Sequence, residues 1–479
     1  MGTFILVLVI MLVVAFIGYL VYNTLNFKPI EEEKTPKIEA KFDEDKVVKN
    51  LQALVRCKTV SYYDHSKEDN KEFNKLINLL PKLYPHVHKT CELIKFKDRG
   101  ILFRWKGKKK GDAAVLMAHY DVVPVEKENW TKPAFDGLIE DDVMWGRGTV
   151  DTKSSFNGIM SAADELIKRR YKPEYDIYFA FSGGEEVNGM GAKHIVDYFD
   201  ENNIKLSMVL DEGGAVVKDI FPGVKEACGL VGIAEKGLMN VEFVAKSNGG
   251  HASAPKPHTP VGVLSKACVK IESHPFKKHF TAPVLKMFDT LGRRSSFLYR
   301  MIFANLWCFG GVLDLICKKS GGELNALVRT TCAFTQMDGS LAPNVVPPEA
   351  KMVANLRLNP EDNIEGAIKY LEKTINDENV KVNLLIGDNP SPISTTKCSG
   401  YMKLEKAISD TWDCVVSPYL MVQCSDSRHY APISNKVYKF SSYDLQDDER
   451  ASIHGNDEHI RLSAIKSSVA FYIRLMKLL

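Results

Sequence analysis

The chain has 479 residues and a mass of 53.7 kDa, which suggests two or three domains. Hydrophobic residues at 45% and charged residues at 26% are ordinary for a globular protein. The formal net charge of +3 gives no indication of nucleic-acid binding. The ten cysteines, which include no Cys-x-x-Cys pair, indicate neither a zinc knuckle nor a dense disulfide framework.

An unbroken apolar run covers residues 4–22. As a helix this run is long enough to cross a hydrocarbon core of about 30 Å, so we predict a single-pass membrane anchor. A cleaved signal peptide is the alternative, but no basic residue precedes the run and no Ala-x-Ala site follows it. Residues 23–42 are charged and contain two prolines, which is typical of a linker. The charges in this linker favour a cytoplasmic body by a small margin.

Strands and helices alternate in the body, which begins at residue 43. Alternation of this kind is typical of a mostly parallel sheet with helices on its faces. Ligands of such sheets bind beyond the carboxyl ends of the strands, so polar residues at those ends are candidate functional residues. Apolar spacing predicts helices over residues 47–55, 70–83 and 154–169, and strands over residues 101–105, 115–118, 176–181 and 206–210.

The strand predicted over residues 115–118 runs directly into His119, Tyr120 and Asp121. Residues two apart on a strand point the same way, so His119 and Asp121 would leave the sheet together. This suits a metal-ligating His119 whose second ring nitrogen is held by the Asp121 carboxylate. A solvated loop after a core strand is the alternative for this triplet taken alone.

Three acidic clusters follow along the chain. Asp151 lies between glycines and a predicted helix, where its carboxylate should stay ionised as a helix N-cap or as a bridging metal ligand. Glu185 and Glu186 follow a strand and two glycines. One of these two can bind a cation while its neighbour faces a substrate, and a solvated acidic turn is the alternative. Asp211 and Glu212 follow the next strand, and such a succession argues against coincidence.

Six short motifs resemble, in order, those of the co-catalytic zinc metallopeptidases of the aminoacylase and carboxypeptidase S type. The likeness extends over roughly residues 45–479. It is closest to carboxypeptidase S and to the secreted N-acyl amino acid hydrolase/synthase branch. Each motif alone is weak, whereas the ordered set is specific. The motifs are HYD at His119, GRGTVDTKSS around Asp151, SGGEEVNGMGA around Glu185 and Glu186, LDEGG at Asp211, GGHASAP at His251 and IHGNDE at His454.

The resemblance implies a centre of two Zn²⁺ ions, with Co²⁺ or Mn²⁺ as other divalent candidates. Asp151 would bridge both ions next to a cis peptide bond, and Glu185 would be the general base and acid. Asp121 would orient the imidazole of the first ligand. The choice between Asp211 and Glu212 is left open. The terminal ligands implied are His119 and Asp211 on one ion, and Glu186 and His454 on the other.

The same resemblance implies an α/β fold. A zinc-peptidase-like catalytic domain with a mostly parallel central sheet would cover residues 43–236 and 389–479. An inserted two-layer α/β lid would cover residues 237–388, through which a homodimer could form, and the transmembrane helix would precede both. Helices are expected over residues 260–273, 361–375, 400–411 and 458–477, and strands over residues 237–247, 330–336, 350–357 and 381–386.

Four further residues complete the implied site. His251 would stabilise the tetrahedral oxyanion. Arg357 and Asn344 would hold a substrate carboxylate, which the planar fork of arginine meets bidentately. Arg428 would also contact this carboxylate, although Cys424 and Ser425 stand in its loop where the family usually has Gly and Thr.

Residues 277–322 depart from a minimal lid. The stretch is rich in Phe, Leu and Trp but is interrupted by Arg300, Asn305 and Asp314. These charged and polar residues disfavour a second membrane span. An apolar acyl pocket and a membrane-facing surface are both open interpretations.

The predicted function is that of a membrane-anchored dinuclear zinc hydrolase. It would cleave the amide bond next to a free carboxylate, in peptides or in N-acyl amino acids. The alternative is an anchored protein that binds such ligands without catalysis. The expected partners are the small substrate and the membrane, with no nucleic acid. The resemblance favours a lumenal or extracytoplasmic body, which the charges flanking the anchor oppose.

Overall fold

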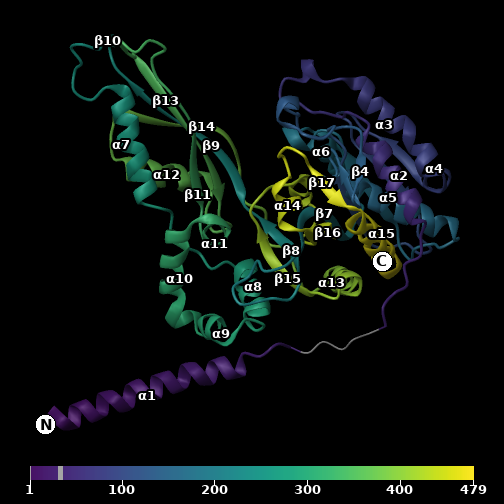
Figure 1. Cartoon of the computed structure of the whole chain (residues 1–479), viewed down its shortest axis with the longest axis horizontal. Coiled ribbons are helices and arrows are strands. Elements are labelled where there is room, and N and C mark those ends of the chain that lie inside the picture. The colour runs from purple at the N-terminus through teal and green to yellow at the C-terminus, as the bar shows by residue number, and fades with distance from the viewer. Residues whose placement is uncertain (1, 31–35) are drawn as a thin grey trace. The chain divides into compact units, whose positions relative to one another are not determined.

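The computed structural model describes residues 2–30 and 36–479, so the linker predicted over residues 23–42 lies partly outside the described residues (Figure 1). The chain divides into two compact units. The sheet unit comprises Pro29–Ile233, Ser394–Tyr419 and Ser425–Leu479. The insert unit comprises Met1–Lys28, Ala234–Ile393 and Leu420–Cys424.

The sheet unit is built on an eight-stranded sheet. Its four central strands, in the order β6-β3-β7-β16, are parallel, as the alternation of strands and helices predicts. Antiparallel pairs extend the sheet on both sides. In spatial order the strands are β1 (Glu92–Lys95), β2 (Ile101–Trp105), β6 (Ile177–Ser182), β3 (Ala113–His119), β7 (Leu206–Val217), β16 (Val437–Asp444), β8 (Cys228–Glu235) and β15 (Val415–Met421).

Strand β3 is buried along its whole length, which explains its continuous apolar sequence. Alternate side chains, such as Leu116 and Val115, belong to two different cores on the two faces of the sheet. Helices therefore cover both faces, and only the strand ends remain for polar chemistry. The larger core includes α2 (Glu44–Val55), α3 (Asn70–Leu83), α4 (Pro85–Thr90), α5 (Lys153–Lys168), α13 (Ser399–Trp412) and α15 (Leu462–Leu478), and the second core includes α6 (Gly191–Glu201).

A small sheet in the same unit joins β4 (Leu138–Glu140), β5 (Val143–Trp145) and β17 (His459–Arg461). The helix predicted over residues 458–477 is wrong at its start. The backbone of β17 pairs with β5, so the final helix α15 begins only at Leu462.

The insert unit contains the predicted two-layer α/β arrangement. An antiparallel four-stranded sheet packs one apolar face against α7 (Pro260–Ser273) and α12 (Ile364–Ile375). A short ladder of β10 (Gly250–His251) and β12 (Val345–Val346) carries His251. The sheet order is β11 (Thr331–Asp338), β13 (Glu349–Leu358), β9 (Gly237–Lys246) and β14 (Val380–Asp388).

The apolar stretch over residues 277–322 folds into helices that the sequence pattern did not predict. Helices α9 (Phe297–Ala304) and α10 (Leu306–Ser320) meet at a bend of 111°, so the pair is not a straight membrane span. Helix α1 (Gly2–Asn26) belongs to the insert unit and is long and apolar enough to cross a membrane. The other helices are α8 (Ala282–Gly292) and α11 (Gly322–Val328).

Candidate metal centre

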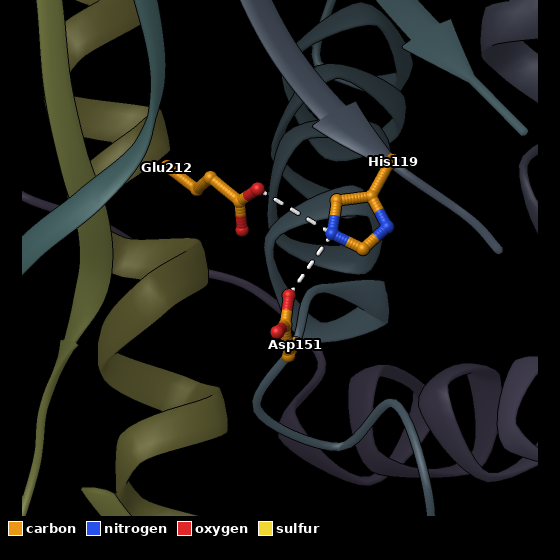
Figure 2. A group of neighbouring side chains, drawn as sticks. All are labelled: His119, Asp151 and Glu212. Carbon is orange, nitrogen blue, oxygen red and sulfur yellow. Dashed lines mark hydrogen bonds and ion pairs between the residues drawn. The ribbon is translucent and has the colours of Figure 1, made fainter. Parts of the chain in front are cut away.

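His119 is the last residue of β3 and is only 2% exposed. Its Nδ1 lies 3.1 Å from the backbone carbonyl oxygen of Asp121 and 3.5 Å from the Asp121 carboxylate. Donation from Nδ1 to these oxygens leaves Nε2 as the lone-pair nitrogen, the tautomer that a metal-ligating histidine requires. Nε2 faces Asp151 and Glu212, which come from two other segments of the sheet unit (Figure 2).

Asp121 is fully buried and holds more than the imidazole. Its carboxylate accepts a hydrogen bond from Ser61 Oγ at 2.8 Å. It also accepts from the backbone N–H groups of Glu185 and Glu186, each at 3.2 Å. One buried carboxylate therefore fixes the end of β3 against the loop that carries the two adjacent glutamates.

Asp151 lies between two imidazoles. Its Oδ1 is 2.9 Å from His119 Nε2, and its Oδ2 is 3.0 Å from His454 Nε2. The peptide bond from Asp151 to Thr152 is cis, which confirms the prediction made from the resemblance. Each oxygen of one carboxylate is thus aimed at a different histidine, which is the geometry of a bridging ligand.

A second buried carboxylate holds the Asp151 loop in place. Glu458 accepts hydrogen bonds from the backbone N–H groups of Val150 at 2.7 Å and Asp151 at 3.1 Å. Its other oxygen pairs with the Arg147 guanidinium at 2.7 Å. The sequence analysis missed this role, although Glu458 stands in the IHGNDE motif, because the residue was assigned to the start of a helix.

Two groups of side chains could each hold a cation. Figure 2 shows the first, in which Glu212 Oε1 lies 3.4 Å from His119 Nε2. In the second, Glu186 Oε2 lies 3.0 Å from His454 Nε2. Ligand atoms within each group lie within 4.8 Å of one another. The groups are His119, Asp151 and Glu212, and Asp151, Glu186 and His454.

Asp211 belongs to neither group within the described part of the chain. Its Oδ2 accepts a hydrogen bond from the backbone N–H of Ser427 at 2.9 Å. Adjacent residues of a strand point to opposite faces, so Asp211 and its neighbour Glu212 cannot share one role. Of the two alternatives left open by the sequence, the geometry favours Glu212.

The electrostatics of the site fit bound cations. Burial, reinforced by neighbouring carboxylates, raises the pKa of Glu212 to about 8. Burial also raises the pKa of Glu186, whose Oε1 is buried without a hydrogen-bond partner among the residues described. Hydrogen bonds to Asp151 and Glu186 raise the pKa of His454 to about 10. Buried carboxylates ionise fully only beside positive charge, and imidazole and carboxylate donors suit divalent metals.

Glu185 lies beside these groups without belonging to either one. It shares the short helical turn η3 (Glu185–Val187) with Glu186, directly after β6. Burial raises the pKa of the Glu185 carboxyl well above its usual value. Such a group is suited to accept a proton and to release it again.

Asp426 is another buried acid that the sequence analysis did not select. It lies in η4 (Asp426–Tyr430) and accepts a hydrogen bond from Ser182 Oγ at the end of β6. Burial raises the pKa of Asp426 to about 7. The loop sequence around it was noted only for Arg428, whose guanidinium donates to Asn188 Oδ1 at 2.8 Å.

The remaining predicted residues, His251, Asn344 and Arg357, lie in the insert unit. His251 is exposed on β10, with Nδ1 2.8 Å from Ser253 Oγ. Asn344 is exposed before β12, and its backbone carbonyl oxygen accepts a hydrogen bond from the Ala252 backbone N–H. Arg357, on β13, donates to Asn355 at 3.3 Å. Their roles toward a substrate stay predictions.

Two donor groups that share one carboxylate define a candidate dinuclear centre of hydrolytic type. The sequence profile of peptidase family M20/M25/M40 matches residues 115–478. The chain belongs to this family of metal-dependent hydrolases, and it is therefore an enzyme of the metallopeptidase and amidohydrolase class.

Similar proteins include the probable carboxypeptidase S-like 2 of Dictyostelium discoideum. It is 32% identical, over 97% of this chain and 92% of its own length. The N-fatty-acyl-amino acid synthase/hydrolase PM20D1 of Xenopus tropicalis is 33% identical, over 91% of this chain and 86% of its own length. The crystal structure of the M20 family metallo-carboxypeptidase Sso-CP2 from Sulfolobus solfataricus aligns with a TM-score of 0.67. At 15% identity over 90% of this chain and 98% of that one, it shows the shared fold.

Replacing Glu458 by alanine should destabilise the sheet unit, because Arg147 would remain buried without its carboxylate. We expect a loss of about 3–5 kcal/mol, the usual cost of breaking a buried ion pair. Denaturant unfolding of the whole chain measures this loss. Glu174→Ala, which removes a surface ion pair with Lys109 in the same unit, is the control and should leave stability nearly unchanged. Equal effects of the two substitutions would contradict the role assigned to Glu458.

Proposed function

We propose that this enzyme is a membrane-anchored dinuclear zinc hydrolase. Its reaction would be hydrolysis of the amide bond next to a free carboxylate, in N-acyl amino acids or in peptides. The observation that carries the proposal is the position of Asp151, whose two oxygens face His119 and His454 at 2.9 and 3.0 Å. The substrate class follows the names of the relatives, an N-fatty-acyl-amino acid synthase/hydrolase and a carboxypeptidase S-like protein.

The residues that would hold the two ions are the two groups that share Asp151. Zinc suits their mixture of imidazole and carboxylate ligands, and Co²⁺ or Mn²⁺ are other divalent candidates. Such ions supply Lewis acidity, which polarises an amide carbonyl and makes water a stronger acid. We assign His119, Asp151 and Glu212 to one ion, and Asp151, Glu186 and His454 to the other.

Glu185 would act as the general base and then as the general acid of the reaction. It takes a proton from the attacking water and passes it to the nitrogen of the departing amine. The buried surroundings that raise its pKa favour both steps near neutral pH. Asp121 supports this residue through its hydrogen bond to the Glu185 backbone N–H, and therefore acts as a positioning residue.

The substrate carboxylate needs a fixed positive partner. We assign Arg357 and Arg428 to this role, together with Asn344, because a guanidinium meets a carboxylate with two parallel hydrogen bonds. His251 would donate a hydrogen bond to the tetrahedral oxyanion. These assignments follow the family resemblance, and a homodimer through the insert unit would be compatible with them.

The N-terminal helix α1 would be the membrane anchor. Nearly all of its side chains are exposed, including Leu12 at 62% and Val14 at 64%, which is unfavourable in water and favourable in lipid. A lumenal or extracytoplasmic position of the body agrees with the resemblance.

Glu185→Gln should lower turnover by about 10²–10⁴-fold, since an amide cannot accept the proton from water. The substitution keeps the shape of the side chain, so bound metal should remain. Steady-state hydrolysis and the metal content of the purified protein measure the two effects. Glu201→Gln, on an exposed position of α6, is the matched control. Undiminished turnover with bound metal would refute the role of Glu185.

The choice of metal ligand in β7 is tested by paired substitutions. Glu212→Gln should reduce bound metal from two ions to about one per chain, because an amide is a poor metal ligand. Asp211→Asn should keep both ions, since that carboxylate accepts a hydrogen bond from Ser427. Elemental analysis of the purified variants measures the number of metal ions per chain and so decides between the two ligands. Loss of metal in Asp211→Asn, with full metal in Glu212→Gln, would reverse the assignment.

Chelation followed by metal replacement tests the whole centre. Treatment with a strong chelator should abolish hydrolysis, and added Zn²⁺ should restore it, because no other group in the site supplies equivalent Lewis acidity. A panel of N-acyl amino acids of different chain length, dipeptides and longer peptides then separates the substrate classes. Absence of hydrolysis of every compound by the zinc-loaded protein would favour the binding protein without catalysis.

A further inference from the structure

Helix α1 is joined to the bend between α9 and α10 by a buried polar contact. Asn305, which links these two helices, is fully buried. Its Nδ2 donates to the Leu20 carbonyl at 3.2 Å, and its Oδ1 accepts from Asn23 Nδ2 at 2.9 Å. Thr24 is also fully buried, 3.4 Å from Asn305 Nδ2. The last turns of α1 are therefore held against the insert unit by specific hydrogen bonds to Asn305.

Aromatic side chains mark the level of this contact along α1. Trp307, at the start of α10, lies 6.1 Å from Phe16 and 6.0 Å from Tyr19, measured between ring centroids, and remains 63% exposed. Trp and Tyr concentrate at the boundary between lipid and water. Just past the end of α1, the Arg293 guanidinium lies over the Phe27 ring. If residues 4–22 of α1 cross a bilayer, Trp307 therefore lies near one end of that span, toward the boundary.

The α9–α10 hairpin presents a large exposed apolar face. On α10, Val312, Leu315 and Ile316 share one side of the helix and are 54%, 67% and 49% exposed. On α9, Phe297 and Leu298 are 47% and 70% exposed. A patch of this kind on a soluble surface marks an interaction site.

The charge of the same segment suits an anionic partner. Residues 277–322 contain eight lysines and arginines but only two aspartates, a net charge of +6, whereas the whole chain carries +3. Both aspartates are paired within the segment or next to it, Asp289 with Arg293 and Asp314 with Lys318 and Arg329. Along the sequence, basic residues therefore flank the apolar residues of the face, the combination by which interfacial helices bind anionic lipids.

We propose that α9 and α10 form an interfacial hairpin that lies in the surface of an anionic bilayer, next to the point where α1 leaves the lipid. The proposal rests on the anchor role proposed for α1 and deepens it, because the insert unit would then contact the membrane at two places. The bend of 111° suits a hairpin that lies on the surface rather than a span.

A lipid surface explains the apolar face better than a second copy of the chain. The face is continuous with α1, whose side chains are exposed along most of its length, through the Trp307 contact. Packing two copies face to face would also bring two segments of net charge +6 together. Anionic headgroups instead neutralise this charge.

Tryptophan probes in the full chain test the proposal. The chain is reconstituted in vesicles of phosphatidylcholine and phosphatidylserine whose acyl chains carry bromine, which quenches nearby tryptophan. Leu315→Trp reports on α10, and Val9→Trp, in the N-terminal half of α1, reports on the anchor. Leu341→Trp is the control, because this exposed residue precedes β12, whose partner β10 lies at the end of the insert unit opposite α9 (Figure 1). Each signal is the emission added to that of the parent chain, and retained hydrolysis of a soluble substrate shows that each variant folds.

The expected result is strong quenching of Leu315→Trp with little quenching of Leu341→Trp. Quenching of Val9→Trp without quenching of Leu315→Trp would overturn the hairpin proposal and leave the anchor in place. Quenching of Leu315→Trp alone would refute the anchor and, with it, the placement of the hairpin beside an emerging α1. Absence of quenching at both positions would refute both proposals. A blue shift of Leu315→Trp that grows with protein concentration, without lipid quenching, would identify the face as a contact between copies and overturn the proposal.

Discussion

The structure of the site depends on one electrostatic constraint, the shared Asp151 carboxylate between two imidazoles. The carboxylates of Asp151, Glu186 and Glu212 come together around the two imidazoles, in a site where burial works against their ionisation. Only positive charge in their midst allows all of them to ionise together. In the described geometry the raised pKa of His454 favours its charged form, and divalent cations would supply more positive charge.

Around this centre, two buried carboxylates hold the backbone in position and take no part in the reaction. Asp121 holds the loop of Glu185 and Glu186, and Glu458 holds the loop of Asp151. Both carboxylates are fully buried and are satisfied by backbone N–H groups. Such bonds fix the backbone itself, so that the ligands come from five separate segments and still meet at one point.

Part of the fold and of the candidate site could be predicted from the sequence, and part could not. The end of β3 at His119 followed from an apolar run too short for a helix, and the order of motifs identified the family. The choice between Asp211 and Glu212 could not follow from the sequence, because a strand places one of two neighbours on each face and the pattern does not fix which. Glu458 was missed because it was assigned to the start of the final helix, and its partners, the Val150 and Asp151 backbone N–H groups and the Arg147 guanidinium, lie far earlier in the sequence. The helices over residues 277–322 were missed because their apolar side chains point outward as well as inward, which removes the usual period.

In the proposed dinuclear centre, sharing of Asp151 would couple the occupancy of the two cation positions. The first ion to arrive would meet a carboxylate with its full negative charge, whereas the second would meet one whose two oxygens, facing His119 and His454, are already partly engaged. Successive dissociation constants should therefore separate: one ion is held tightly, whereas its neighbour has the larger dissociation constant and needs a higher free metal concentration to stay bound. The free concentration of the more weakly bound metal ion would then set the fraction of chains that carry both ions and are competent for hydrolysis, without any change in the fold.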